Sequence, residues 1–192
     1  MQLTIRRTDG NVGKYVQDDL RRAHILMQRL NPAKLFNSGP IVIGVLSPFT
    51  ILNPDEVCWV EVQTSELEMP QMLPANVERL RKLSGREEYE EVLARQWPLW
   101  RSNARSSPGD LLEALVELTF RGGHSLYLHV TGHVEKKPLS EIIFGPPAIT
   151  ASVLPEGTLY INTKCIVRAR VYHSMTEVSY PLGLWCAEAD EI

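Results

Sequence analysis

The sequence contains few cysteines and no long apolar stretch. Cys58, Cys165 and Cys186 are the three cysteines among 192 residues, and they form neither a CxxC pair nor a zinc-ligand spacing. An odd number of widely spaced cysteines argues against a disulfide framework and favours a reducing compartment. The longest apolar runs, such as residues 41–46, are far shorter than the roughly 20 residues that cross a bilayer. The first residues lack the apolar segment of a signal peptide, so we expect an intracellular, cytoplasmic protein without a transmembrane segment.

The chain also lacks a strong charge of either sign. Its formal net charge is -3 and its pI is about 6.0, whereas a protein that binds nucleic acid over its whole surface would be strongly basic. Any anion-binding surface must therefore be a local patch. The 44% of hydrophobic and 22% of charged residues are ordinary for a folded protein, and the length predicts a single domain over residues 1–192.

The sequence contains no motif that identifies an enzymatic reaction. There is no GxSxG and no HExxH, and Gly10–Lys14 is too short for a phosphate-binding loop and has no Ser or Thr after the lysine. His129 and His133 share one face of a predicted strand, but roughly 13 Å separates such residues, which is too far for two ligands of one zinc. We therefore expect no cofactor and no metal. Cys58 and Cys165 fall on apolar strand faces, which indicates packing rather than nucleophilic chemistry.

Hydrophobic periodicity divides the chain into three parts. Strands are expected in the first and last parts, because apolar residues there alternate or form short continuous runs. A helix with one buried face is expected over residues 15–30, and a block of helices between the strands, where Pro98 should end the second helix. The expected strands are 2–7, 39–46, 58–63, 125–133, 158–172 and 177–187, and the expected helices of the block are 74–84, 84–97 and 107–122.

This order predicts an α+β fold. The sheet should be largely antiparallel and built from the N-terminal and C-terminal segments, with the helical block of about residues 65–122 inserted between them. The clearest strand, residues 158–172, would approach 50 Å in length at about 3.3 Å per residue. We therefore expect a bend or bulge within it.

Two basic-aromatic surfaces are predicted. Aromatic rings stack on bases while cations meet phosphates, and tryptophan beside arginine equally suits the headgroup level of an anionic membrane. A structural interpretation competes with this one, because tryptophans usually pack in cores and arginines on a sheet pair with acids of the next strand. The first surface comprises Arg95, Trp100, Arg101 and Arg105, and the second, on the polar face of the long strand, comprises Tyr160, Lys164, Arg168, Arg170 and Tyr172.

The two tryptophans of RQWPLWRSNAR, residues 95–105, have different expected positions. Trp97 follows Leu93 by four residues and continues the apolar face of that helix, so it should pack inward. Trp100 lies beyond Pro98 and need not follow that face. An exposed Trp100 would make the stretch a contact site, whereas a buried Trp100 would make it a helix terminus.

LHVT at residues 128–131 resembles one half of the motif of the two-histidine phosphoesterase family, whose members carry two apolar-His-x-Thr/Ser-apolar strands. The resemblance implies that one histidine acts as a base and the other as an acid on an RNA phosphate, while the hydroxyls bind the phosphate. The site residues would then be His129, Thr131 and His173, although Met175 stands where the second Ser or Thr is expected. This chemistry needs two histidines that face one phosphate.

The expected function is that of a non-enzymatic binding or assembly protein whose partner is an anionic membrane surface or single-stranded RNA. Homo-oligomers are expected because long strands offer edges for self-association. In architecture the chain resembles matrix proteins of rhabdovirus-like viruses, which self-assemble under an anionic membrane and begin their folded part with strand, amphipathic helix and apolar strand. It lacks their basic N-terminal arm and their P-P-x-Y motif. The alternative is a phosphoesterase-like enzyme that acts on RNA or phosphate esters through His129.

Overall fold

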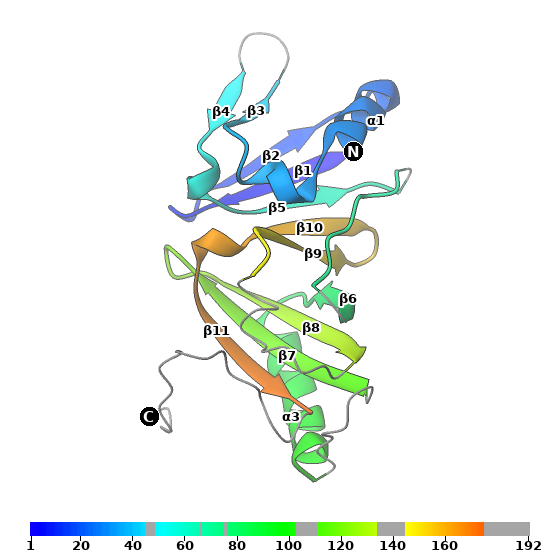
Figure 1. Ribbon diagram of the computed structural model, residues 1–192, viewed down its shortest axis with the longest axis vertical. Helices are drawn as coiled ribbons and strands as arrows, with labels where there is room; N and C mark the ends of the chain where they lie inside the picture. Colours follow the sequence, from blue (N-terminus) through cyan, green and yellow to red (C-terminus); the bar gives the residue numbers. More distant parts are fainter. Residues whose placement is uncertain (45–48, 66, 75–76, 103–110, 134–144, 175–192) are drawn as a thin grey trace.

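A nine-stranded sheet dominates the computed structural model, which describes residues 1–44, 49–65, 67–74, 77–102, 111–133 and 145–174 (Figure 1). The described residues also form a separate two-stranded hairpin, three α-helices and two short 3-10 helices. The strands are β1 (Gln2–Arg7), β2 (Val12–Val16), β3 (Ile41–Ile43), β4 (Thr50–Leu52), β5 (Val57–Gln63), β6 (Val77–Lys82), β7 (Leu111–Phe120), β8 (Ser125–His133), β9 (Ala148–Val153), β10 (Gly157–Asn162) and β11 (Ile166–His173). The helices are α1 (Leu20–Arg29), α2 (Pro32–Leu35), α3 (Arg86–Ser102), η1 (Pro54–Glu56) and η2 (Thr163–Cys165).

The strand order of the large sheet is β11-β7-β8-β6-β9-β10-β5-β1-β2. Strands from the beginning of the chain therefore pair with strands from its last third, since β5 lies between β1 and β10. Every pairing is antiparallel except a short parallel contact of β6 with β9. The α+β class and the mostly antiparallel sheet predicted from the sequence are confirmed.

The sheet curls until its two halves share one core. β5 and β7 are far apart in the strand order, yet the rings of Trp59 and Phe120 lie only 5.1 Å apart. β10 leads through η2 directly into β11, so one continuous segment crosses from one half to the other. η2 and a bulge between Ile166 and Arg168 break the long strand predicted over residues 158–172, which confirms the expected bend.

Two further cores lie on the outer faces of the curled sheet. The first lies where α1, α2 and the β3–β4 hairpin pack on the strands around β5, and it includes Met27, Phe36 and Tyr160. The second lies beneath α3, which covers the face of β7 and β8 that points away from the central core (Figure 1). Each helix is thus held by a layer of apolar contacts rather than by helix propensity alone.

The predicted helical block of residues 65–122 is reduced to one helix, α3. Residues 77–82 form β6 and residues 111–120 form β7, where the sequence predicted helices. β7 lies between β8 and β11 and is covered on both faces, so apolar residues occur almost continuously along it. A continuous apolar run of this kind fits a buried helix as well as a buried strand, which explains the wrong prediction. Similarly, residues 15 and 16, expected to begin the first helix, belong to β2 (Val12–Val16).

α3 continues through Pro98 to Ser102, so the prediction that proline ends this helix is wrong. Proline removes one backbone hydrogen bond and crowds the preceding turn. Burial of Trp100, one half-turn later, offsets that cost by adding a large apolar side chain to the core beneath α3. Across the described residues, no helix is long and apolar enough to cross a membrane.

Candidate functional site

The predicted basic-aromatic stretch around Trp100 is the second half of α3, not a loop. Trp100 is only 6% exposed, and its indole Nε1 donates a hydrogen bond to Glu113 on β7 at 3.3 Å. Trp97 is half-buried, with its ring edge-on to that of Tyr172 at 5.1 Å. Neither tryptophan is a free aromatic surface. Arg95 and Arg101 are exposed cations on α3, and Arg105 lies outside the described residues.

The second predicted surface, along residues 160–172, does not form one face. Tyr160 is fully buried, because β10 lies between β5 and β9 with both faces covered, and its hydroxyl donates to the Pro70 carbonyl at 3.0 Å. η2 then turns the chain, so the residues before and after it belong to different halves of the sheet. Lys164 and Arg168 are exposed, Arg170 approaches Glu117 at 3.5 Å, and Tyr172 packs against Trp97.

The histidines of the predicted phosphoesterase site lie on opposite faces of the sheet. His129 of β8 pairs with Leu115 of β7, whereas His173 of β11 pairs with the neighbouring Ala114. Successive strand residues point to opposite faces, so His129 and His173 cannot face one phosphate. Thr131 shares the face of His129, since it lies two positions further along the strand. The two-histidine arrangement implied by the sequence resemblance is therefore corrected.

His129 occupies a confined position between β8 and α3. Burial lowers the pKa of its imidazole below the ordinary 6.5, and the neighbouring guanidinium of Arg81 acts in the same direction, against the opposing carboxylate of Glu113. Its Nε2 is buried and has no hydrogen-bond partner among the described residues. His133, at the end of the strand, contacts Glu78 at 2.8 Å. The described residues contain no cluster of three or more His, Cys, Asp or Glu placed to hold a metal.

α1 presents a different surface that the sequence patterns did not single out. Asp19 caps the helix, and its carboxylate accepts hydrogen bonds from the backbone N–H groups of Arg21 and Arg22 at 2.9 and 3.2 Å. Ala23 and Met27 point into the core beneath the helix. The remaining apolar side chains of the helix, Leu20, Ile25 and Leu26, are exposed beside Arg21 and Arg22.

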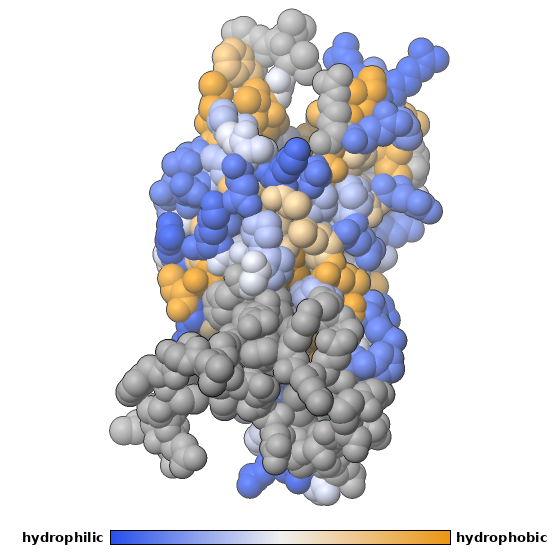
Figure 2. All heavy atoms as spheres, viewed as in Figure 1, coloured by the Kyte–Doolittle hydropathy of each residue, from blue (hydrophilic) through white to orange (hydrophobic). Residues whose placement is uncertain are grey.

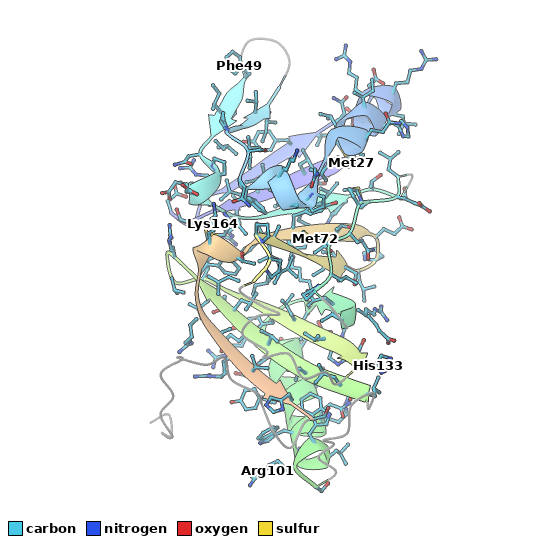
Figure 3. The ribbon with its side chains drawn as sticks, viewed as in Figure 1. Met27, Phe49, Met72, Arg101, His133 and Lys164 are labelled. Carbon is cyan, nitrogen blue, oxygen red and sulfur yellow. The ribbon has the colours of Figure 1, made fainter. Side chains whose placement is uncertain are left out.

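The β3–β4 hairpin adds an apolar face to the same end of the molecule. Ile41, Ile43 and Leu52 pack against the core beneath α1. The alternate residues Val42 and Ile51 are cross-strand partners that point outward, 55% and 59% exposed. Phe49, which precedes β4, is 58% exposed and lies at the extreme end of the hairpin (Figure 3). Both faces of this hairpin are apolar. The inner face packs on the core, but the core does not account for the apolar residues on the outer face.

We call this region the α1–hairpin surface, and cations outnumber acids on it, although Asp19 at the cap of α1 approaches Arg22 at 3.5 Å. No Asp or Glu occurs between Asp19 and Asp55, whereas four cations do. Half of the large apolar side chains that are exposed in the described residues belong to this surface. Figure 2 shows apolar atoms gathered over the hairpin and beside α1, next to hydrophilic side chains. The surface consists of Leu20, Arg21, Arg22, Ile25, Leu26, Lys34, Val42, Phe49 and Ile51.

The sequence carried a signal for this surface in the absence of acids over residues 20–54. Helical periodicity places Leu20, Ala23 and Met27 on one face of α1, whereas Ile25 lies nearly opposite Ala23 and Met27 around the helix. The absence of acids over residues 20–54, together with the position of Ile25 away from the buried face of α1, therefore indicates the α1–hairpin surface. Which hairpin face points outward could not be read from the sequence, since it depends on where the hairpin docks.

Comparison with known proteins yields no relative for this chain. No protein-family model matches it, and no similar protein was found among curated proteins or solved structures.

Proposed function

We propose that this protein is a non-enzymatic binding and assembly protein that attaches to an anionic membrane surface through the α1–hairpin surface. The single observation that carries the proposal is the group of exposed apolar side chains on α1 and the β3–β4 hairpin, within a segment, residues 20–54, that has four cations and no acid. Single exposed leucines need no explanation, whereas several exposed apolar side chains on two adjacent elements favour an interaction site.

The chemistry of the patch fits a bilayer boundary. Aliphatic side chains such as Ile25, Leu26 and Val42 enter the acyl region, and each one fully buried there contributes about 1.5–3 kcal/mol. Cations such as Arg21 and Arg22 remain at the anionic headgroups, where each contributes about 1 kcal/mol. An α-helix lying in the plane of the membrane combines these two contributions.

Single-stranded RNA is a poorer partner for this surface. Binding to bases relies on aromatic rings that are free to stack. The α1–hairpin surface offers one exposed ring, Phe49, against five exposed aliphatic side chains, and the other rings that the sequence offered for stacking, Trp97, Trp100, Tyr160 and Tyr172, are buried or packed on each other. The enzyme alternative, with His129 acting on phosphate esters, loses its second histidine because His173 lies on the opposite face.

Vesicle flotation tests the proposal with a charge reversal. The variant carrying Arg21→Glu and Arg22→Glu should bind phosphatidylserine-containing vesicles at least about thirtyfold more weakly, since the loss of two headgroup contacts removes about 2 kcal/mol. Glutamate near a helix N-terminus is favourable, so α1 should stay folded, which circular dichroism checks. Added salt should weaken the binding of the unmodified protein, and vesicles of phosphatidylcholine alone should bind little.

A matched control uses the cations of α3. Arg95→Glu with Arg101→Glu changes the net charge equally but lies outside the α1–hairpin surface, so it should leave vesicle binding nearly unchanged. A loss confined to this control would place the contact on α3, as the sequence predicted, and would contradict the proposal. Failure of the unmodified protein to bind anionic vesicles at low salt would also overturn it, as would binding of single-stranded RNA in preference to vesicles.

Self-association is the second part of the proposed function. The resemblance to matrix proteins of rhabdovirus-like viruses predicts assembly beneath a membrane, and β2 and β11 are the two outermost strands of the sheet. Lys14 on β2 and Arg168 on β11 are exposed, and charges of this kind disfavour unspecific pairing of edges. Assembly should therefore be promoted by the membrane. Mass determination in solution, with and without small anionic vesicles or lipid nanodiscs, measures it.

A further inference from the structure

His24 is the one histidine in the acid-free segment of residues 20–54. It is exposed on α1, three residues after Arg21 and next to Ile25, and both of these belong to the α1–hairpin surface. Residues three apart on a helix are neighbours on its surface. A change in the charge of His24 therefore acts on the part of the molecule that is proposed to meet the membrane.

The hydrogen bond of His24 is compatible with both protonation states of its ring. Its Nε2 lies 2.8 Å from the side-chain amide nitrogen of Gln28, one turn further along α1. In this arrangement the amide donates and Nε2 accepts, so the ring is neutral with its proton on Nδ1. Gln28 is exposed as well, and rotation of its amide brings the oxygen to Nε2, where it accepts from a protonated ring. The helix can therefore take up a proton here without repacking the core.

Two charged side chains line the hollows on either side of His24. Arg21 lines the one beside Leu20 and Ile25, and Glu68, on the segment that follows β5, lines the other beside Met27. A cation disfavours an imidazolium ion beside it, whereas an acid or an anionic headgroup favours it. If the protonated ring pairs with Glu68, an acid at the border of the surface is neutralised. The net charge of the region therefore rises by one whether or not that pair forms.

We infer that His24 makes attachment through the α1–hairpin surface pH-dependent, so that the protein binds anionic membranes more tightly at mildly acidic pH. This inference rests on the proposed membrane attachment. Histidine is the side chain that ordinarily changes its charge between about pH 5 and pH 8. Protonation of His24 adds one cation to those of Arg21, Arg22 and Lys34. One more cation near anionic headgroups should give roughly a fivefold gain in affinity, which corresponds to about 1 kcal/mol.

The test is vesicle flotation at about pH 7.5 and about pH 5.5, the range in which histidine titrates. The vesicles contain phosphatidylglycerol and phosphatidylcholine, whose phosphodiester groups keep the same charge at both pH values, so a change in binding comes from the protein. The unmodified protein should bind about fivefold more tightly at the lower pH. His24→Gln, which cannot gain a proton, should keep the weaker affinity at both. His24→Arg, which is always cationic, should have the tighter affinity at both.

His133→Gln is the matched control. His133 is exposed too, but it lies at the end of β8, where it contacts Glu78, and is not part of the α1–hairpin surface. This variant should therefore retain the fivefold response. Because His24 and His133 are both exposed, neither substitution removes a core side chain, and circular dichroism at both pH values checks that each variant is folded.

Equal affinity of the unmodified protein at the two pH values would overturn the inference and leave the proposed attachment intact. A response that survives in His24→Gln, or one that disappears in His133→Gln, would also overturn it, because another group would then carry the response. So would a His24→Arg variant that binds no more tightly than the unmodified protein at about pH 7.5. Absence of binding at both pH values would contradict the proposed attachment and this inference together.

Discussion

His129 and His124 are both held in surroundings that disfavour the imidazolium ion. Burial is the main cause at each position, and cations add to it, Arg81 beside His129 and Arg6 beside His124. A charged imidazole at these positions would lack the solvation that it has in the unfolded chain. Both histidines therefore contribute to core packing in their neutral form, which is an ordinary structural role for this residue.

The free energy of unfolding should consequently fall as the pH drops below about 6.5. The folded-state pKa of each histidine is below that value, so the unfolded chain binds protons first and is favoured by acid, whereas above pH 6.5 both states are neutral and the full stability is present. Urea unfolding at pH 7 and pH 5 measures the fall. His129→Gln should reduce it, and stability that rises on acidification would contradict this account.

Trp100 shows at the scale of one residue what the sequence could and could not predict. The helix around Tyr89 was predicted correctly, and its buried face continues to Trp100, because eleven residues are close to three helical turns. The prediction failed at Pro98, which was expected to end the helix, so that Trp100 would not have to lie on its buried face. Whether a proline ends a helix or lies within it depends on the packing that follows it, which local sequence does not contain.

At the scale of elements, the turn between β7 and β8 packs against the turn between β1 and β2. Gly122 and Gly123 both have positive φ, 86° and 82°, a conformation that favours glycine. They differ in their surroundings, since a Cβ on Gly122 would overlap the carbonyl oxygen of Thr8, whereas a Cβ on Gly123 would meet open space. Substitution of each glycine in turn therefore distinguishes the cost of a steric clash from the cost of backbone strain, because the two share one backbone conformation.

Gly122→Ala should therefore destabilise the protein more than Gly123→Ala. The left-handed conformation costs about 1–2 kcal/mol in either variant. In Gly122→Ala the backbone of Thr8 must also move, so we expect a total loss of about 3 kcal/mol or more in the free energy of unfolding. Urea denaturation of the two variants measures the difference. Equal losses would mean that the two turns are not in contact.

The strands illustrate why fold class was predictable and topology was not. The strands β1 and β8 were predicted from their sequence, because one fully covered face leaves an alternating pattern. β7 was mistaken for a helix because two covered faces leave none. The curl of the sheet, which brings Trp59 to Phe120, depends on contacts between distant segments and has no local signature.

At the scale of the whole molecule, the two candidate contact regions lie at opposite ends. Phe49 of the α1–hairpin surface and Arg101 of α3 mark these ends in Figure 3. The sequence predicted a local anion-binding patch but placed it on α3 and on the strand of residues 160–172, because it relied on aromatic residues that the fold buries. The acid-free segment was present in the sequence, yet only the fold shows that its apolar residues remain uncovered.

Hydrogen exchange measured by mass spectrometry with anionic vesicles tests the central claim most directly. Amide hydrogens that a membrane covers exchange more slowly, and the position of each protected segment identifies the attached surface. We predict slower exchange in α1 and in the β3–β4 hairpin, with no change in α3 or β11. Protection of α3 or β11 without protection of α1 and the hairpin, or no protection at all, would contradict the proposed membrane attachment.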